Sequence, residues 1–275
     1  MSTNTDREES RTLVVRGQQV RVVVRPPRGH FADAPPLLLC NGIGASLEVL
    51  QPLVDALHPD RGVVRFDVPG VGGSPLPRAP YTMAVLASWL GALVTELDFG
   101  RFDVLGLSWG GGVAQQLAFH CPRRVRNVVL VATGTGCLMV PARPEILGKM
   151  MTPRRHRDPA YAARVAGELY GGSMRSDPER GRALLHQARP VGPKRGYYYQ
   201  LAAGFGWSSL PGLPFLRQPT LVLAGDDDPI IPVVNAHLMA RMIPRSQLHI
   251  YHGGHLAVLT ESDELVPVVE RFLRG

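Results

Sequence analysis

The chain has 275 residues, of which 45% are hydrophobic, and it carries a formal net charge of +7. A chain of this length can bury about 75% of its unfolded surface, so we expect one globular domain with an elaboration, needing neither disulfides nor metal. Cys40, Cys121 and Cys137 show no C-x-x-C spacing, so we expect neither a zinc site nor a disulfide framework. This cysteine usage favours a reducing compartment.

The first eleven residues are polar and charged, and we expect a flexible tail at positions 1–11. They lack the apolar core of a signal peptide, and the chain has no run of about 18 apolar residues. The sequence therefore predicts a cytoplasmic protein without a transmembrane segment. Next, Thr12–Arg16 and Gln19–Val24 flank Gly17-Gln18 and predict an N-terminal β-hairpin.

Short apolar runs then alternate with amphipathic stretches. In Tyr81–Asp98 the apolar residues fall on one helical face, and Thr260–Leu273 opens with a Thr-x-x-Asp capping-box pattern. Such alternation predicts a mostly parallel sheet with helices on both faces. The expected strands are Pro36–Cys40, Gly62–Phe66, Phe102–Leu107, Asn127–Ala132, Thr220–Ala224 and Gln247–Tyr251.

The alternation stops after residue 134. From 135 to 217 the chain is rich in proline, glycine, methionine and tyrosine, and it has 13 Lys and Arg against 5 Asp and Glu. We interpret 135–217 as a mainly helical cap inserted into a core made of 12–134 and 218–275. A basic segment can bind nucleic acid or an anionic surface, but no nucleic-acid-binding motif accompanies it, so a solvated face is the favoured interpretation.

The pentapeptide Gly106-Leu107-Ser108-Trp109-Gly110 follows an apolar run and precedes a helix-like stretch. This Gly-x-Ser-x-Gly pattern is typical of a nucleophile elbow, a strained turn from strand to helix that exposes a serine hydroxyl. Glycines flank the serine because side chains would clash there. Ser108 is therefore the candidate nucleophile.

A nucleophilic serine needs a histidine to take its proton and a carboxylate to orient that histidine, and α/β-hydrolases place them in the order Ser, acid, His. Gly225-Asp226-Asp227-Asp228-Pro229 and Gly253-Gly254-His255 supply both, each after a predicted strand. We favour Asp228, which lies farthest beyond the strand, over Asp226 and Asp227. His255 is favoured over His252 because two glycines allow a close approach to the serine.

An ester hydrolase also needs amide donors aimed at the developing oxyanion. The amide of Trp109 is one candidate, and that of Ile43 in the loop Asn41-Gly42-Ile43-Gly44-Ala45 is the other, unless this loop is a plain glycine-rich turn. The glycine-rich stretch 67–74 lacks the ending of a phosphate loop and predicts a structural turn. No cofactor or metal is expected.

With these residues the chain resembles intracellular poly(3-hydroxyalkanoate) depolymerases that act on medium-chain-length polyesters. The resemblance implies an α/β-hydrolase fold with a lid, Ser108 as nucleophile, Asp228 as orienting acid and His255 as base. The segments that carry it are Asn41–Ala45 with Leu47-Glu48, Phe66–Ser74, Ser108–Gly111, Gly196–Leu201 and Thr220–Pro229.

The expected activity is cleavage of this polyester through an acyl-enzyme, in the cytoplasm and at the surface of polyester granules. The alternatives are a small-molecule carboxylesterase, a lactonase or a carbon–carbon bond hydrolase with the same triad, and a non-catalytic binding protein with this fold. Apolar residues of the cap are candidates to line a substrate channel or touch a granule, unless they form ordinary cap core. They are Met150, Met151, Tyr197, Tyr198, Tyr199 and Trp207.

Overall fold

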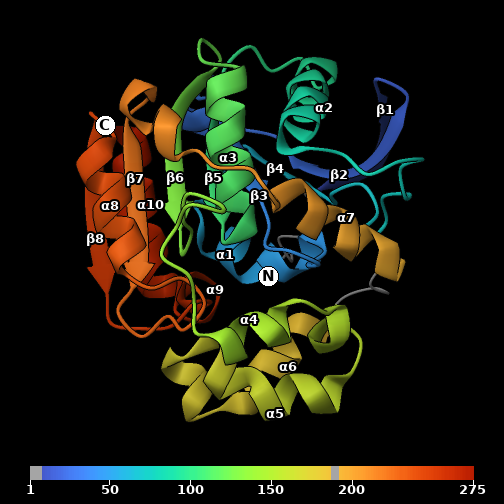
Figure 1. Cartoon of the computed structure of the whole chain (residues 1–275). Coiled ribbons are helices and arrows are strands. Elements are labelled where there is room, and N and C mark those ends of the chain that lie inside the picture. Colours follow the sequence, from blue (N-terminus) through green and yellow to red (C-terminus); the bar gives the residue numbers. More distant parts are fainter. Residues whose placement is uncertain (1–7, 187–191) are drawn as a thin grey trace.

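The computed structural model describes residues 8–186 and 192–275 of the chain. At its centre is an eight-stranded sheet with the order β1-β2-β4-β3-β5-β6-β7-β8 (Figure 1). β2 is antiparallel to both of its neighbours, whereas the remaining pairs are parallel. The strands are β1 (Glu9–Val15), β2 (Gln18–Arg25), β3 (Leu37–Cys40), β4 (Val63–Phe66), β5 (Phe102–Leu107), β6 (Val125–Val131), β7 (Thr220–Gly225) and β8 (Ser246–Tyr251).

The central strands are apolar on both faces because each face is covered by helices, as expected for parallel strands. Leu37 and Leu39 of β3 join one hydrophobic cluster, and the alternating Leu38 and Cys40 join the other. The first face packs against α1 (Gln51–Ala56), α9 (Ala257–Thr260) and α10 (Ser262–Arg274). The second packs against α2 (Met83–Glu96), α3 (Trp109–His120) and α8 (Val234–Met242). The predicted α/β layering is confirmed.

Between the neighbouring strands β6 and β7 the chain leaves the sheet and forms a separate set of helices. In Figure 1, α4, α5 and α6 lie together at one end of the sheet, whereas α7 lies closer to the core. The elements are α4 (Pro144–Met150), η4 (Pro153–His156), α5 (Pro159–Tyr170), η5 (Gly172–Arg175), α6 (Pro178–His186), α7 (Lys194–Gly204) and η6 (Leu210–Phe215), where η denotes a 3₁₀ helix. We call 135–217 the cap.

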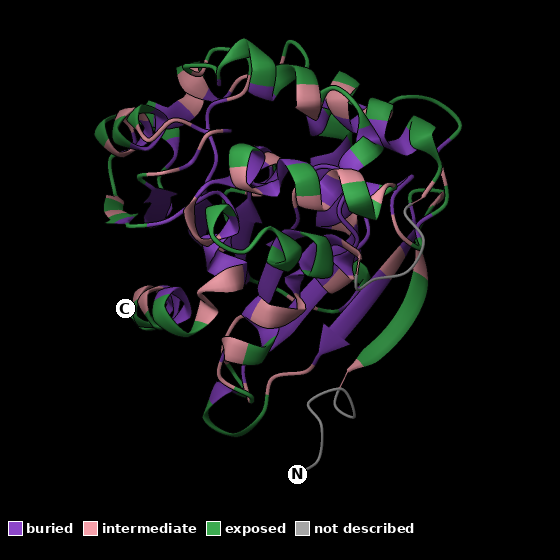
Figure 2. Cartoon of the chain, turned by 90° about the horizontal axis from the view of Figure 1, so that it is seen from below, coloured by how far each residue is buried: buried purple, intermediate pink, exposed green. Residues whose placement is uncertain are grey.

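The N-terminal hairpin differs from the prediction at its turn and at its first residues. Its turn is Arg16-Gly17, and both residues have positive φ, as a two-residue type I′ turn requires. β1 begins at Glu9, so the expectation of a tail at 1–11 is wrong for the last residues of that range, which pair with β2. β1 is mostly exposed beside the buried β2 (Figure 2), and its polar composition had suggested a tail. Residues 1–7 lie outside the described ranges.

The predicted capping box at Thr260 is also wrong. Thr260 is the last residue of α9, and its hydroxyl is directed back to the Leu256 carbonyl. α10 begins at Ser262 directly after this turn, with Glu261 at its N-cap and no side-chain cap. Because the chain is already helical at Thr260, this residue cannot adopt the extended conformation that an N-cap needs.

The glycine-rich stretch 67–74 folds as a turn around the buried carboxylate of Asp67. One oxygen accepts a hydrogen bond from the Leu47 amide at 2.8 Å, and the other accepts from the Gly73 amide at 2.7 Å. A Cβ atom on Gly72 would lie 2.4 Å from that carboxylate. The loop therefore encloses its own anion, which agrees with the predicted structural turn.

Candidate active site

Ser108 lies at the sharp turn that joins β5 to α3. Its backbone has φ 56° and ψ −121°, a strained conformation for a residue other than glycine. A Cβ atom on Gly106 would lie 2.3 Å from the Gly110 carbonyl oxygen, and one on Gly110 would lie 2.1 Å from that of Cys40. Both glycines are therefore required by close backbone packing, and the geometry is that of a nucleophile elbow.

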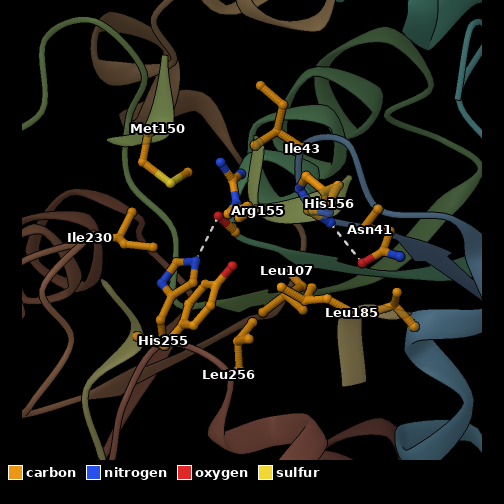
Figure 3. Close-up of a pocket in the computed structure, with 15 residues that line it drawn as sticks. Asn41, Ile43, Leu107, Met150, Arg155, His156, Leu185, Ile230, His255 and Leu256 are labelled. Atoms are coloured by element: carbon orange, nitrogen blue, oxygen red, sulfur yellow. Dashed lines mark hydrogen bonds between the residues drawn. The ribbon is translucent and has the colours of Figure 1, made fainter. Parts of the chain in front are cut away.

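The side chains of Ser108, His255 and Asp228 form one continuous hydrogen-bonded chain. The distance from His255 Nδ1 to Asp228 Oδ2 is 2.7 Å. The distance from His255 Nε2 to Ser108 Oγ is 2.9 Å, and Figure 3 draws this bond as a dashed line at His255. All three residues are buried, with exposed fractions of 8%, 2% and 8% respectively. The structure thus brings together the three residues that the sequence selected.

Each partner of the serine is held by backbone groups. The His255 amide donates to the Tyr170 carbonyl at 2.7 Å, and its ring stacks on Tyr170 with a centroid distance of 6.4 Å. Asp228 Oδ1 accepts hydrogen bonds from the amides of Ile230 and Ile231 at 2.8 and 2.9 Å. These bonds favour the ionised carboxylate. Its other oxygen, Oδ2, accepts from His255 Nδ1 and so favours the tautomer with the proton on Nδ1.

The three consecutive aspartates have three different partners. Asp226 contacts the imidazole of His252 at 2.9 Å, on the surface. Asp227 accepts two bonds from Arg175 of the cap, at 2.8 and 2.7 Å, and the Arg175 guanidinium lowers the pKa of Asp227 to about 2. Only Asp228 reaches His255 among the three, so the alternation of side chains along this loop separates their roles.

His252, the alternative base, is directed to solvent. Its side chain is 95% exposed, and its hydrogen bond to Asp226 raises its pKa. Gly253 and Gly254 separate His252 from His255, whose side chain contacts Ser108. The structure does not bring His252 to the nucleophile.

The loop 41–45 lies against the elbow. A Cβ atom on Gly42 would lie 3.7 Å from Ser108 Cβ, so the loop and the nucleophile are in direct contact. The Asn41 side chain accepts from the Gly42 amide and donates to the Ser46 carbonyl, which shapes the loop. Within the described ranges no protein acceptor is assigned to the amides of Ile43 and Trp109. These two N–H groups are thus available near the serine.

A pocket opens at Ser108, and both the core and the cap line it. The cap side includes two residues that sequence reasoning missed, Arg155 and His156 of η4 (Figure 3). The only sequence signal was the Arg154-Arg155-His156-Arg157 run, which had been interpreted as part of a solvated basic face. Core residues of the lining are Asn41, Gly42, Ile43, Ala45, Val49, Leu107, Ser108, Ile230, His255 and Leu256, and cap residues are Met150, Arg155, His156, Tyr170 and Leu185.

Of the six apolar cap candidates, only Met150 lines this pocket. Tyr197 is buried behind it, and its hydroxyl accepts a hydrogen bond from Arg155 Nη1 at 2.9 Å. Met151 and Tyr198 are exposed on the surface of the cap. Tyr199 and Trp207 pack on the core, where the Trp207 indole donates to Gln116 at 2.7 Å. Expecting all six to face one channel was therefore wrong for this pocket.

Burial governs the charge of the cap groups around the pocket. Burial lowers the pKa of His156 well below its ordinary value, and the nearby Arg155 lowers it further, so this imidazole is neutral near pH 7. Its Nε2 has no hydrogen-bond partner among the described residues. Burial also raises the pKa of Tyr170 and Tyr197 against the opposing effect of Arg155. Both phenols are therefore uncharged.

A family model described as the alpha/beta hydrolase fold matches residues 35–262. This range includes Ser108, Asp228, His255 and six of the eight strands. The chain therefore belongs to the α/β-hydrolase fold family.

Within that family, a poly(3-hydroxyalkanoate) depolymerase from Ectopseudomonas oleovorans is 46% identical over 265 residues, which are 96% of this chain and 92% of that protein. Among solved structures, an enol-lactonase from Burkholderia xenovorans LB400 superposes with a TM-score of 0.81 at 23% identity, over 96% of this chain and all of the other. A hydrolase from Pseudomonas aeruginosa PA01 gives 0.79 at 26% identity, over 97% and 99%. The two structures support the fold, and the depolymerase is a close sequence relative.

No helix in the described part of the chain combines the length and the apolar composition needed to span a membrane.

Proposed function

We propose that this chain is a serine ester hydrolase that cleaves poly(3-hydroxyalkanoate), with side chains of medium length, to 3-hydroxy acid oligomers and monomers. The hydrogen-bonded chain from Ser108 through His255 to Asp228 carries the chemical part of this proposal. The 46% identity to a depolymerase carries the choice of polymer. A triad alone specifies acyl transfer and leaves the substrate open.

The geometry supports a two-step reaction through an acyl-enzyme. His255 Nε2 takes the Ser108 proton as Oγ attacks the ester carbonyl, and the amides of Trp109 and Ile43 stabilise the oxyanion. The ester C–O bond then breaks, and His255 gives its proton to the leaving hydroxyl. In the second step His255 deprotonates water, which attacks the acyl carbonyl, and the proton returns to Ser108. Water is the only co-reactant, and no cofactor is needed.

The decisive experiment compares clearing of a poly(3-hydroxyoctanoate) emulsion with turnover of short soluble esters. We expect clearing, and we expect Ser108→Ala to lower kcat by about 10⁶-fold on any ester that the enzyme accepts. Ser88→Ala on α2, outside the site pocket, is the matched control and should keep full activity. Brisk short-ester turnover without clearing would replace the polymer by a small ester or lactone.

We further propose that the enzyme works in the cytoplasm at the surface of polyester granules. The exposed apolar side chains of Leu138, Val140, Leu147 and Met151 lie on one stretch of the cap, and the cap as a whole has 13 Lys and Arg against 5 Asp and Glu. Together they suit an apolar surface with an anionic coat. Sedimentation with granules should weaken as salt is raised from 0.05 to about 0.5 M, because exposed charges are screened. Binding that salt leaves unchanged would remove the electrostatic part of this proposal.

A further inference from the structure

Arg155 is a buried cation in the wall of the active-site pocket. It is 3% exposed, and it lines the same pocket as Ser108 and His255 (Figure 3). Most of the remaining lining is apolar, with Val49, Leu107, Met150, Leu185, Ile230 and Leu256. Nothing in the proposed transfer of protons between Ser108, His255 and water requires a fixed positive charge at this place.

The charge of Arg155 has no acidic partner within residues 8–186 and 192–275. Its Nη1 donates to the Tyr197 hydroxyl at 2.9 Å and to the Thr152 carbonyl at 3.5 Å, and the Tyr170 hydroxyl is a further side-chain partner. Tyr170 and Tyr197 are uncharged phenols, and the carboxylate of Asp228 is already occupied by His255 and two amides. The guanidinium, which lies 5.5 Å from the centroid of the Tyr197 ring, therefore has no carboxylate to balance it among the described residues.

Two other buried arginines show what a structural guanidinium looks like in this protein. Arg61 forms a two-pronged ion pair with Glu270, at 2.8 and 2.7 Å. Arg25 uses Nε, Nη1 and Nη2 to reach three backbone carbonyls at 3.1 to 3.2 Å. By contrast, the side-chain partners of Arg155 among the described residues are the uncharged phenols Tyr170 and Tyr197, and none is a carboxylate. Burying a cation without an acidic partner is costly unless a ligand supplies the negative charge.

We propose that Arg155 binds the carboxylate of the substrate unit that leaves, which is the free carboxyl end of a polyester chain. This inference rests on the proposed ester hydrolysis. A planar guanidinium without an acidic partner matches a carboxylate in geometry and charge. In a 3-hydroxyalkanoate chain only two carbons separate the scissile ester oxygen from the terminal carboxylate. The ester and the carboxylate of one substrate unit can therefore face Ser108 and Arg155, which line the same pocket.

The reaction then proceeds from the carboxyl end. Ser108 attacks the carbonyl of the last ester bond, that C–O bond breaks, and His255 protonates the leaving oxygen. The product is a 3-hydroxy acid whose carboxylate was held by Arg155 throughout. The burial of Ser108 and His255 beneath the cap agrees with entry of a chain end rather than the middle of a polymer.

The test compares the linear dimer of 3-hydroxyoctanoate with its methyl ester, which differs only in the terminal carboxylate. For the wild-type enzyme we expect kcat/KM on the free acid to exceed that on the methyl ester by at least 10-fold. Arg155→Gln should lower this ratio by about 10- to 100-fold, the usual effect of losing charge-assisted hydrogen bonds. Arg154→Gln is the matched control, because the Arg154 side chain is 57% exposed and pairs with Asp158 on the surface. It should keep the wild-type ratio.

A wild-type ratio near one would overturn the proposal, and so would an Arg155→Gln enzyme that keeps the preference. If that variant does not fold, the wild-type ratio still decides. Competition against p-nitrophenyl octanoate gives a second wild-type measurement, in which 3-hydroxyoctanoate should inhibit at least 10-fold more strongly than its methyl ester.

A polymer whose carboxyl ends are methyl-esterified tests whether the carboxylate that Arg155 binds is that of the polymer chain end. Slower initial release of monomer from it than from the free polymer supports the chain end, and equal release overturns end recognition. If the wild-type enzyme cleaves neither dimer and no polymer, the proposed depolymerase function has failed, which is a different outcome from lost discrimination.

Discussion

The core and the cap build one pocket in different ways. On the core side, Ser108, Asp228 and His255 each follow a strand and are held mainly by backbone groups close to the sheet edge. On the cap side, Arg155 depends on Tyr197, which lies 42 residues farther along the chain. The proposed chemistry is therefore positioned by local turns of the core, whereas the proposed recognition of substrate by Arg155 depends on distant parts of the cap packing together.

Among the substitutions that test this contrast, we expect replacement of Asp228 in the core to lower activity most. Asp228→Asn should lower kcat by about 10⁴-fold, because an amide favours the wrong imidazole tautomer while leaving the geometry intact. Asp226→Asn, whose carboxylate contacts only His252 and a backbone amide on the surface, should stay within about 2-fold of the wild type. Steady-state kinetics on a soluble ester measure both. Equal losses in the two variants would contradict the separation of the aspartates.

A smaller effect is expected where the cap meets the oxyanion loop. Gly44 has φ 74°, its amide donates to Gln200 of α7, and a Cβ atom there would lie 2.7 Å from the Tyr197 ring. Gly44→Ala should cost about 1–2 kcal/mol for the left-handed backbone and about 1–3 kcal/mol more for the clash. It should also lower kcat, because the loop carries the Ile43 amide.

Gly17→Ala separates these two costs. Gly17 has φ 79° with nothing within 4 Å of an added Cβ atom, so it should show the backbone cost alone. Urea unfolding gives the free energy of unfolding of each variant. If the free energy of unfolding falls equally in both variants, the Tyr197 ring does not pack against Gly44 as tightly as the structure shows.

The smallest effect concerns the tie between cap and core at Asp227. Its pKa is lowered from 3.8 to about 2 by Arg175, so the ion pair stabilises the fold above about pH 4, and this contribution is lost as pH falls toward 2. Because the Asp227 and Arg175 side chains are 39% and 52% exposed, solvent screening limits the gain to about 1 kcal/mol or less. Thermal unfolding should place the Tm of Asp227→Asn below that of the wild type at pH 7. The two values should converge near pH 2.

Most of the core could be predicted from sequence because its signals are local. The strand Phe102–Leu107 was predicted with the correct ends, since an apolar run stops where the glycine-flanked serine forces a turn. The order of Ser108, Asp228 and His255 then placed all three at one edge of a parallel sheet. Where local signals were ambiguous, as at Thr260 and in residues 9–11, the prediction failed because neighbouring elements decided the conformation.

The cap candidates could not be sorted in the same way. Tyr197, Tyr198 and Tyr199 are consecutive on α7, so the helix directs them to different surroundings, and composition cannot say which one is buried against Arg155. Arg155 lies in a run of basic residues in which Arg154 is exposed and Arg155 is buried. Only the packing of η4 against Tyr197 distinguishes them.

The sequence by itself determined the fold class, the elbow at Ser108 and the order of the three groups that meet there. These follow from periodicity and backbone strain, which act over a few residues. The sequence favoured Asp228 among the three aspartates, and the tertiary structure showed its contact with His255. The tertiary structure alone decided that a cation of the cap lines the pocket. Those outcomes depend on the direction of each side chain, and that direction is set when segments distant in sequence pack together.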